Sequence, residues 1–363
     1  MAWRFGDSKI LKIAAALDEG LSDIMKTLRE DLIGRISSEF LRLEPVSVIP
    51  ECPYGSALFP CEPIGEYRLS VPISDLSPES EAPGRILMER GFSVGAIDSG
   101  IFSLGPHMLV DLTVVNVGIW VHNYGDGSGI CDNVARVISY VGGSRNIQVL
   151  VKDFEIEILE EFLTEMNGSL RFLLLDESLS LAYTLAWSAE DREEMVERVL
   201  RMIDLALRHN VVPIGVFYTR AMDISRGIAT MTGSEVPEAS DRALMNTLIS
   251  AGSRSPLFLV HSKAIRGKID ILAFYLKVGD KNVLRVEFPQ SARNLTDEIY
   301  LVVLLQSILG GGYPLALQRA HSLAVIGRDE REFIINEVCR RLGLPELAYV
   351  FSKKYTSKRW PVI

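Results

Sequence analysis

The sequence predicts an α/β fold in which a mixed sheet is flanked by helices. Short runs rich in Val, Ile and Leu indicate buried strands, and they alternate with longer segments whose apolar residues recur every three or four positions. The composition agrees with this prediction. Of the 363 residues, 48% are hydrophobic and 23% are charged, as in ordinary globular chains, which excludes long-range disorder.

Residues 1–90 are predicted to form a long N-terminal helix followed by an irregular extension. Apolar residues recur at helical spacing up to Leu43, which predicts one helix over residues 8–43. A terminal helix of this length packs either on a partner subunit or on its own domain. Prolines and glycines are frequent in residues 50–65 and 76–84, so both segments are expected to be loops.

Residues 91–345 are predicted to form the core. Its first half contains two strands that end in an aspartate, at Asp98 and Asp176, and one helix that carries five glutamates. The strands are expected at residues 93–98, 109–121, 147–151 and 171–176, and the helix at residues 153–166.

The second half of the core continues the alternation of strands and helices. Two of its strands are expected to form an antiparallel hairpin that turns at Gly279-Asp280. Strands are expected at residues 211–218, 256–260, 271–278 and 283–288, and helices at residues 188–208, 240–251, 296–309, 315–326 and 329–342.

The charge excludes one class of nucleic-acid protein. A net charge of −9 and a pI of about 5.3 argue against a protein that coats nucleic acid without specificity. An acidic nucleic-acid enzyme remains compatible, because carboxylates that hold metal lower the pI while a local basic patch binds the substrate. Such a patch lies in the predicted C-terminal tail, residues 346–363, which contains Lys353, Lys354, Lys358 and Arg359.

The sequence also bears on the compartment. No apolar run reaches the roughly 18 residues that a membrane span needs. The N-terminus lacks the apolar core of a signal peptide, so a cytoplasmic protein is expected. The four cysteines have neither C-x-x-C spacing nor a histidine at metal-site spacing, which argues against a zinc site.

Carboxylates are the residues most suggestive of chemistry. Asp98 and Asp176 follow apolar strands, and the acid-rich helix at residues 153–166 lies between them in sequence. A carboxylate at the end of a strand is exposed at the rim of the sheet, where open α/β sheets bind ligands. Ribonuclease-H-like nucleases have this order of Asp, Glu and Asp, and their carboxylates hold Mg²⁺ or Mn²⁺ for phosphoryl displacement. Aspartate is also common at strand ends as a turn former, so the order alone is a weak indication.

Five short motifs follow one another along the sequence and give a more specific indication. They are Ala96-Ile-Asp98-Ser-Gly, Ile158-Leu-Glu160, Leu173-Leu-Leu-Asp176-Glu-Ser-Leu179, Leu284-Arg-Val-Glu-Phe-Pro289, and Gly312-Tyr313-Pro314-Leu315 followed by Ala320-His321. With these motifs the chain resembles the archaeal NurA nuclease family. Two of them depart from the family pattern, since the first has Asp-Ser-Gly in place of Asp-Gly-Ser and the third has Glu177 in place of glycine. Both keep the aspartate.

The resemblance implies a ribonuclease-H-like, divalent-metal-dependent deoxyribonuclease. Asp98, Glu160 and Asp176 would ligate Mn²⁺ or Mg²⁺, while His321 would ligate a metal or move a proton, and Tyr313 would bond a phosphate oxygen or stack on a base. The implied activity is cleavage of single-stranded DNA and 5′ to 3′ degradation of duplex ends in recombinational repair. The implied partners are DNA, a HerA-type hexameric helicase and a second copy of the chain.

Several alternatives stay open. Glu157 lies one turn before Glu160 and is the other candidate for the helix ligand. The whole chain could instead be a non-catalytic repair partner, or an ATP-binding protein of the actin and sugar-kinase class. The latter class needs a second Asp-x-Gly loop, which Asp176-Glu-Ser does not supply.

Weaker candidates for functional roles are also present. Two acidic residues on strands could support the site or form structural ion pairs, one His–Asp pair lies in a glycine-rich turn, and three basic residues could contact the DNA backbone or be solvated. The two acidic residues are Asp111 and Glu287, the His–Asp pair is His122 and Asp126, and the three basic residues are Arg220, Arg226 and Lys263.

Overall fold

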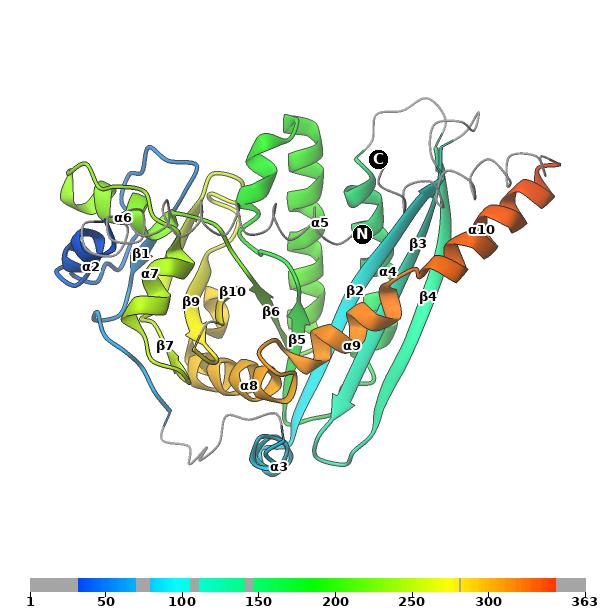
Figure 1. Cartoon of the computed structure of the whole chain (residues 1–363), viewed down its shortest axis with the longest axis horizontal. Helices are drawn as coiled ribbons and strands as arrows, with labels where there is room; N and C mark the ends of the chain where they lie inside the picture. Colours follow the sequence, from blue (N-terminus) through cyan, green and yellow to red (C-terminus); the bar gives the residue numbers. More distant parts are fainter. Residues whose placement is uncertain (1–31, 70–78, 105–110, 141–145, 281, 344–363) are drawn as a thin grey trace, which may run out of the picture. The chain divides into compact units, whose positions relative to one another are not determined.

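The computed structural model describes residues 32–69, 79–104, 111–140, 146–280 and 282–343 (Figure 1). The chain divides into two compact units, each built from several stretches of the sequence. Unit 1 comprises residues 1–80, 177–188 and 214–308, and unit 2 comprises residues 81–176, 189–213 and 309–363. The predicted α/β class, a mixed sheet with flanking helices, is confirmed.

Unit 2 is built on four strands, namely β2 (Phe92–Leu104), β3 (Asp111–Asn123), β4 (Gly129–Tyr140) and β5 (Leu170–Leu175). Their order is β5-β2-β3-β4 (Figure 1). β2, β3 and β4 form an antiparallel meander, whereas β5 runs parallel to β2. The apolar run of β5 is buried because strands inside a sheet are covered on both faces.

Two helices of unit 2 contact opposite faces of β2. They are α4 (Ile147–Leu163) and α9 (Leu315–Ala324). A Cβ at Gly95 would meet the ring of Phe162 in α4, whereas a Cβ at Gly100 would overlap the carbonyl oxygen of Ala324 in α9. Successive side chains of a strand point to opposite faces, so odd-numbered residues here face α4 and even-numbered residues face α9.

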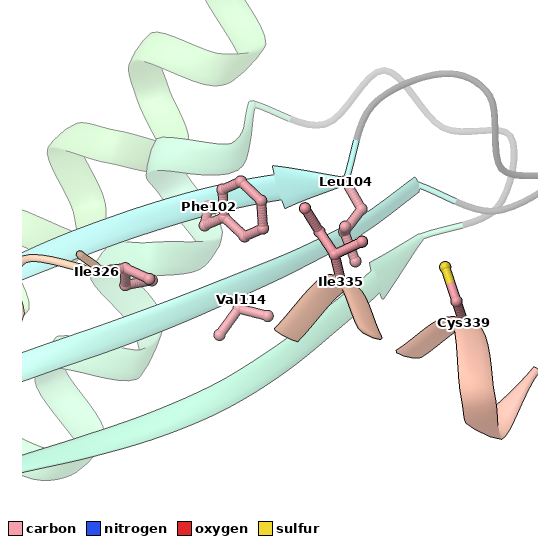
Figure 2. Packing of buried hydrophobic residues seen from close by; sticks show 6 residues of the cluster. All are labelled: Phe102, Leu104, Val114, Ile326, Ile335 and Cys339. Atoms are coloured by element: carbon pink, nitrogen blue, oxygen red, sulfur yellow. The ribbon is translucent and has the colours of Figure 1, made fainter. Parts of the chain in front are cut away.

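Three further helices complete unit 2, namely α3 (Ala82–Glu89), α5 (Ala189–Arg208) and α10 (Arg328–Arg341). α5 packs against α4. α10 packs on β2 and β3 through the apolar cluster in Figure 2, in which Ile335 lies near Phe102, Leu104 and Val114. This cluster continues the sheet core beyond the end of α9.

Unit 1 has its own antiparallel strands, in the order β1-β8-β9-β10-β6 with β7 paired to β9. α8 is apolar on all sides, and eleven of its 14 residues are buried, as expected of a core helix. The strands are β1 (Ser56–Pro60), β7 (Ser253–Arg254), β8 (Phe258–Ser262), β9 (Ile271–Lys277), β10 (Val283–Pro289) and β6 (Val211–Phe217), the last belonging to unit 1 from Ile214 onward. The helices are α2 (Gly34–Phe40), η2 (Ala182–Ala186), α6 (Asp223–Thr232), α7 (Asp241–Leu248), η3 (Gln290–Leu295) and α8 (Thr296–Leu309).

A buried polar network lies inside unit 1. Arg285 is 2% exposed and pairs with Asp223 and Glu287, each at 2.7 Å. Asp241 accepts hydrogen bonds from the Tyr275 hydroxyl at 2.7 Å and from two backbone amides. Burial raises the pKa of Asp241 to about 7, and the negative charge of Asp223 adds to this shift.

Four predicted elements differ from the structure. The strand expected to end at Asp98 continues to Leu104, because it stays paired with β3 along its whole length. Residues 147–151 are the first turns of α4, since the Asn146 side chain caps the Gln148 amide and starts a helix there. The loop expected at residues 50–65 contains β1, which pairs with β8. The loop expected at residues 76–84 overlaps α3 from Ala82.

Two predictions fall partly or wholly outside the described residues. Of the helix expected over residues 8–43, the part before residue 32 is outside them, and the described α helix ends at Phe40. The basic tail at residues 346–363 lies entirely outside them. Within the described ranges, no helix is long and apolar enough to cross a membrane.

Candidate active site

Asp98 and Asp176 lie beside each other in unit 2. β2 and β5 run in parallel and are paired up to Ile97 and Leu175, so the two aspartates directly follow neighbouring residues. β5 ends there, whereas β2 continues beside β3. The two carboxylates therefore lie where the parallel pair ends, as the sequence predicted for Asp176.

His321 of α9 contacts Asp98. Its Nδ1 lies 2.7 Å from Asp98 Oδ2, and the backbone amide of Ser99 donates to Asp98 Oδ1 at 2.8 Å. A carboxylate only accepts hydrogen bonds, so Nδ1 carries a proton in this contact and Nε2 is the nitrogen left for another partner. The His321 side chain is 64% exposed and that of Asp98 is 24% exposed, so both are open to a ligand.

Small residues allow α9 to lie this close to the sheet. A Cβ at Gly118, which is paired with Asp98, would overlap the carbonyl oxygen of Ala320. The buried Asn116 donates from Nδ2 to the carbonyl oxygens of Leu323 at 2.8 Å and Ala324 at 3.1 Å, at the C-terminal end of α9. These contacts fix α9, the helix that carries His321, against the sheet.

Tyr313 contacts Asp176. Its hydroxyl donates to Asp176 Oδ1 at 2.6 Å. Gly311 and Gly312 have positive φ angles of 67° and 121°, which allow the sharp turn between α8 and α9 that presents Tyr313. Gln318 Nε2 donates to the Tyr313 carbonyl oxygen at 2.8 Å and so fixes this turn.

The surroundings of Asp176 disfavour the ionised form of its carboxyl group. Partial removal from water raises the pKa of Asp176 above its ordinary value, and the negative charge of Asp98 acts in the same direction. The hydrogen bond from Tyr313 and the charge of His321 oppose this rise. Two carboxylates that repel each other in this way form a place where a cation is stabilised.

The helix glutamates lie across the sheet from this pair. Ser99 points to the face opposite Asp98, and its hydroxyl donates to Glu155 Oε1 at 2.5 Å. Glu155 is buried and also pairs with Lys152 at 2.5 Å. Sequence reasoning missed this Ser99–Glu155–Lys152 chain, although the spacing of Lys152 and Glu155 on one helix face is visible in the sequence.

Glu160 and Glu157 lie elsewhere on α4. Glu160 is exposed, and its side chain makes no hydrogen bond or ion pair with a described residue. It is rotated by about 140° around the helix from Glu155. Glu157 pairs with Arg136 at 2.7 Å. Among the described residues, no group of three or more His, Cys, Asp and Glu side chains is arranged to hold a metal ion. The structure thus brings together Asp98, Asp176, His321 and Tyr313, and leaves Glu160 outside.

The pair of aspartates still fits a hard divalent cation. An ionised carboxylate has about four lone-pair positions. Ser99 and His321 use two of those on Asp98, and Tyr313 uses one on Asp176. Mg²⁺-type ions are commonly held by one or two carboxylates, with water and substrate phosphate completing the shell. Asp98 and Asp176 therefore have oxygens to offer such an ion.

The weaker candidates lie in structural contacts or at the surface. Glu287 is fully buried in unit 1 and accepts from the Ser180 amide at 2.9 Å, and Arg226 pairs with Glu238 at 3.2 Å. Asp126 caps its own turn by accepting from the Ser128 amide, and Lys263 donates to the Pro53 carbonyl oxygen. Of the others, His122 stacks on Trp120, Arg220 is exposed, and the side chain of Asp111 lies outside the described set.

Substituting Gly118→Ala tests whether the close approach of α9 positions His321. The added methyl group must displace the helix backbone, which costs about 1–3 kcal/mol of stability and moves His321 away from Asp98. We expect the activity of this site to fall more steeply than the unfolding temperature. The matched control is Gly84→Ala, where a Cβ meets nothing within 4 Å. Equal activity in the two variants would contradict the positioning role of Gly118.

Comparison with known proteins identifies the family. The sequence profile of the NurA domain matches residues 92–326, which span β2 to the end of the α9 region. The fold is similar to that of the NurA nuclease from Sulfolobus solfataricus, with a TM-score of 0.59 and 14% identity over 92% of this chain and 97% of that chain. At this identity the likeness establishes the fold.

Two other solved structures are less similar. One NurA structure has a TM-score of 0.45 and 11% identity over 94% of this chain and 99% of that chain. A NurA structure bound to dAMP and manganese has a TM-score of 0.36 and 10% identity over 93% and 98% of the two chains. No curated protein sequence matches the chain significantly. The domain match covers well over half of the sequence, and the chain belongs to the NurA family.

Proposed function

We propose that this chain is a divalent-metal-dependent nuclease that hydrolyses DNA phosphodiester bonds at Asp98 and Asp176. The observation that carries the proposal is the pair of carboxylates at the end of β2–β5 pairing, one bonded to His321 and the other to Tyr313. A hard cation binding there, Mn²⁺ or Mg²⁺, would polarise the scissile phosphate and lower the pKa of a bound water. The family membership supports the same activity.

His321 is proposed to move the proton. Its Nδ1 donates to Asp98 Oδ2, which holds the ring in one tautomer and leaves Nε2 as the proton acceptor. The exposed ring is accessible to a substrate phosphate and its attacking water. In this role Asp98 orients the imidazole as well as holding the cation, as the acidic partner of a catalytic histidine does in other hydrolases.

Tyr313 is proposed to bind the substrate beside Asp176. Its hydroxyl bonds to the carboxylate, so the aromatic ring is fixed at the edge of the site. A ring held in this way can stack on a base of a single strand. We further propose, on the family membership, cleavage of single-stranded DNA, 5′ to 3′ degradation of duplex ends, action with a HerA-type helicase in repair, a cytoplasmic location and a homodimer.

His321→Ala is expected to lower the rate of DNA cleavage by roughly a hundredfold, the scale for losing a positioned acid–base group. DNA affinity should change little, because the binding of phosphate and base does not need the imidazole. The measurement is single-turnover cleavage of labelled single-stranded DNA together with an equilibrium binding titration. His209→Ala, at the C-terminal end of α5, is the matched control. A normal cleavage rate for His321→Ala would remove this residue from the mechanism.

The helix glutamates can be ranked by substitution. We expect Glu155→Gln to cost more activity than Glu157→Gln, because Glu155 holds Ser99 beside Asp98 whereas Glu157 pairs with Arg136 at the surface. Glu160→Gln tests the metal ligand that the family resemblance implies. Complete loss of activity in the Glu160→Gln variant would show that Glu160 reaches the metal. An unchanged rate of DNA cleavage would leave Asp98 and Asp176 as the carboxylate ligands.

The direct test of function is a metal-dependent cleavage assay. The purified chain is incubated with labelled single-stranded DNA and Mn²⁺, with and without a chelator. Cleavage that the chelator abolishes supports the nuclease, and its absence at every metal tested favours the alternative of a non-catalytic repair partner. ATP binding without DNA cleavage would favour the actin and sugar-kinase alternative.

A further inference from the structure

β4 is an exposed edge strand. β3 is the only described strand that pairs with it, and it forms the outer edge of the unit 2 sheet (Figure 1). Seven consecutive residues, from Cys131 to Val137, are exposed, and Val134 and Val137 are 39% and 58% exposed. Edge strands are usually blunted by charged side chains, proline or a bulge. Along its twelve paired residues β4 has neither proline nor a bulge, and its two charged residues, Asp132 and Arg136, are of opposite sign.

The sequence of β4 is complementary to itself. If two copies pair antiparallel about Val134, each residue meets the one at the mirrored position. Asp132 of one copy then lies opposite Arg136 of the other, and this ion pair forms twice. Cys131 lies opposite Val137, and Ile130 opposite Ile138, so apolar residues also meet apolar residues. Opposite charges directly across an antiparallel pair stabilise it, and a two-fold interface needs such self-complementarity.

The face of β4 toward α4 has a groove and a fixed arginine side chain beside the outer edge. A groove of about 440 Å³ is lined by Val134 and Arg136 of β4 and by Phe154 and Ile158 of α4, among others. The Arg136 guanidinium lies 4.1 Å from the Phe154 ring centroid and pairs with Glu157, so it is fixed in place before any partner arrives. A fixed cation loses less side-chain entropy when Asp132 of a second copy approaches.

We infer that β4 pairs antiparallel with β4 of a second copy of this chain, centred on Val134, and joins two unit 2 sheets into one. The backbone N–H and C=O groups of the outer edge then find partners in the other copy, and the exposed valines are covered. The inference rests on the homodimer proposed above and specifies its surface.

Disulfide trapping tests the register. In a Cys131→Ser background, Val134→Cys should form an interchain disulfide on mild oxidation, because directly opposed residues of an antiparallel pair have Cα atoms within disulfide range. Val137→Cys should form one when Cys131 is kept and none when Cys131 is serine. These two Val137→Cys variants differ only at position 131, which is expected to lie opposite position 137 of the other copy. Equal trapping in both Val137 variants, or none at Val134, would overturn the inference.

A charge exchange tests the ion pairs without oxidation. Asp132→Arg and Arg136→Asp should each weaken the dimer at least tenfold, because like charges then oppose each other, and the double variant should restore it. The dissociation constant is measured by sedimentation, and unfolding temperature reports on the monomer fold. A dimer unaffected by both single substitutions would place the interface elsewhere. A wild-type chain monomeric at all concentrations would overturn the homodimer as well, while its DNA cleavage would still test the nuclease separately.

Discussion

Asp98→Asn is expected to reduce metal-dependent cleavage of single-stranded DNA to background. The substitution keeps the size of the side chain and removes one of the two charges that would hold the cation. It also leaves one acceptor oxygen for two donors, the Ser99 amide and His321 Nδ1. Losing several kcal/mol of transition-state stabilisation corresponds to about a thousandfold in rate or more. The fold should be retained, because the residue is partly exposed and its backbone pairing with Gly118 is unchanged.

The control for this prediction is Asp126→Asn, the same chemical change in an exposed turn of unit 2. Asp176→Asn should behave as Asp98→Asn does. Both variants are compared with the wild-type chain by circular dichroism and by cleavage of labelled DNA at saturating Mn²⁺. A folded Asp98→Asn variant that cleaves at the wild-type rate would contradict the assignment of the site.

Arg285→Met should have the largest effect on stability, about 3–5 kcal/mol. The guanidinium is almost completely buried and pairs with Asp223 and Glu287. Its removal leaves the buried Glu287 without this cation and leaves Asp223 with the longer 3.6 Å pair to Arg226. The measurement is the free energy of unfolding by denaturant. Arg340→Met is the matched control, because its ion pair with Glu337 has the same length of 2.7 Å and lies at the surface. Equal losses in the two variants would show that burial does not decide the strength of these pairs.

Much of the fold and part of the site follow from local sequence patterns. The apolar runs before Asp98 and Asp176 marked strands correctly, because buried parallel strands are apolar throughout. The hairpin of β9 and β10 and the helices α5, α8, α9 and α10 were likewise predicted close to their observed bounds. The family resemblance implied that His321 belongs to the same site as Asp98, and the two side chains are in contact; the catalytic role remains a prediction.

What the sequence could not provide depends on three-dimensional pairing. β4 was not predicted, because its mixed polar and apolar residues have no clear face and only its pairing with β3 makes it a strand. Ile147, Val149 and Val151 are β-branched, which favours a strand over residues 147–151, and the Asn146 cap overrides that preference. The choice among the glutamates of α4 requires knowing that Asp98 and Ser99 point to opposite faces, which no spacing along the helix reveals.

The central claim is that Asp98 and Asp176 hold the catalytic cation. The most direct measurement is the anomalous signal of Mn²⁺ in crystals of the chain soaked with the metal. The account predicts a Mn²⁺ peak within about 2.0–2.3 Å of a carboxylate oxygen from each aspartate, near the ring of His321. Strong Mn²⁺ peaks elsewhere and none at this pair, in crystals of a chain that cleaves DNA with Mn²⁺, would contradict it.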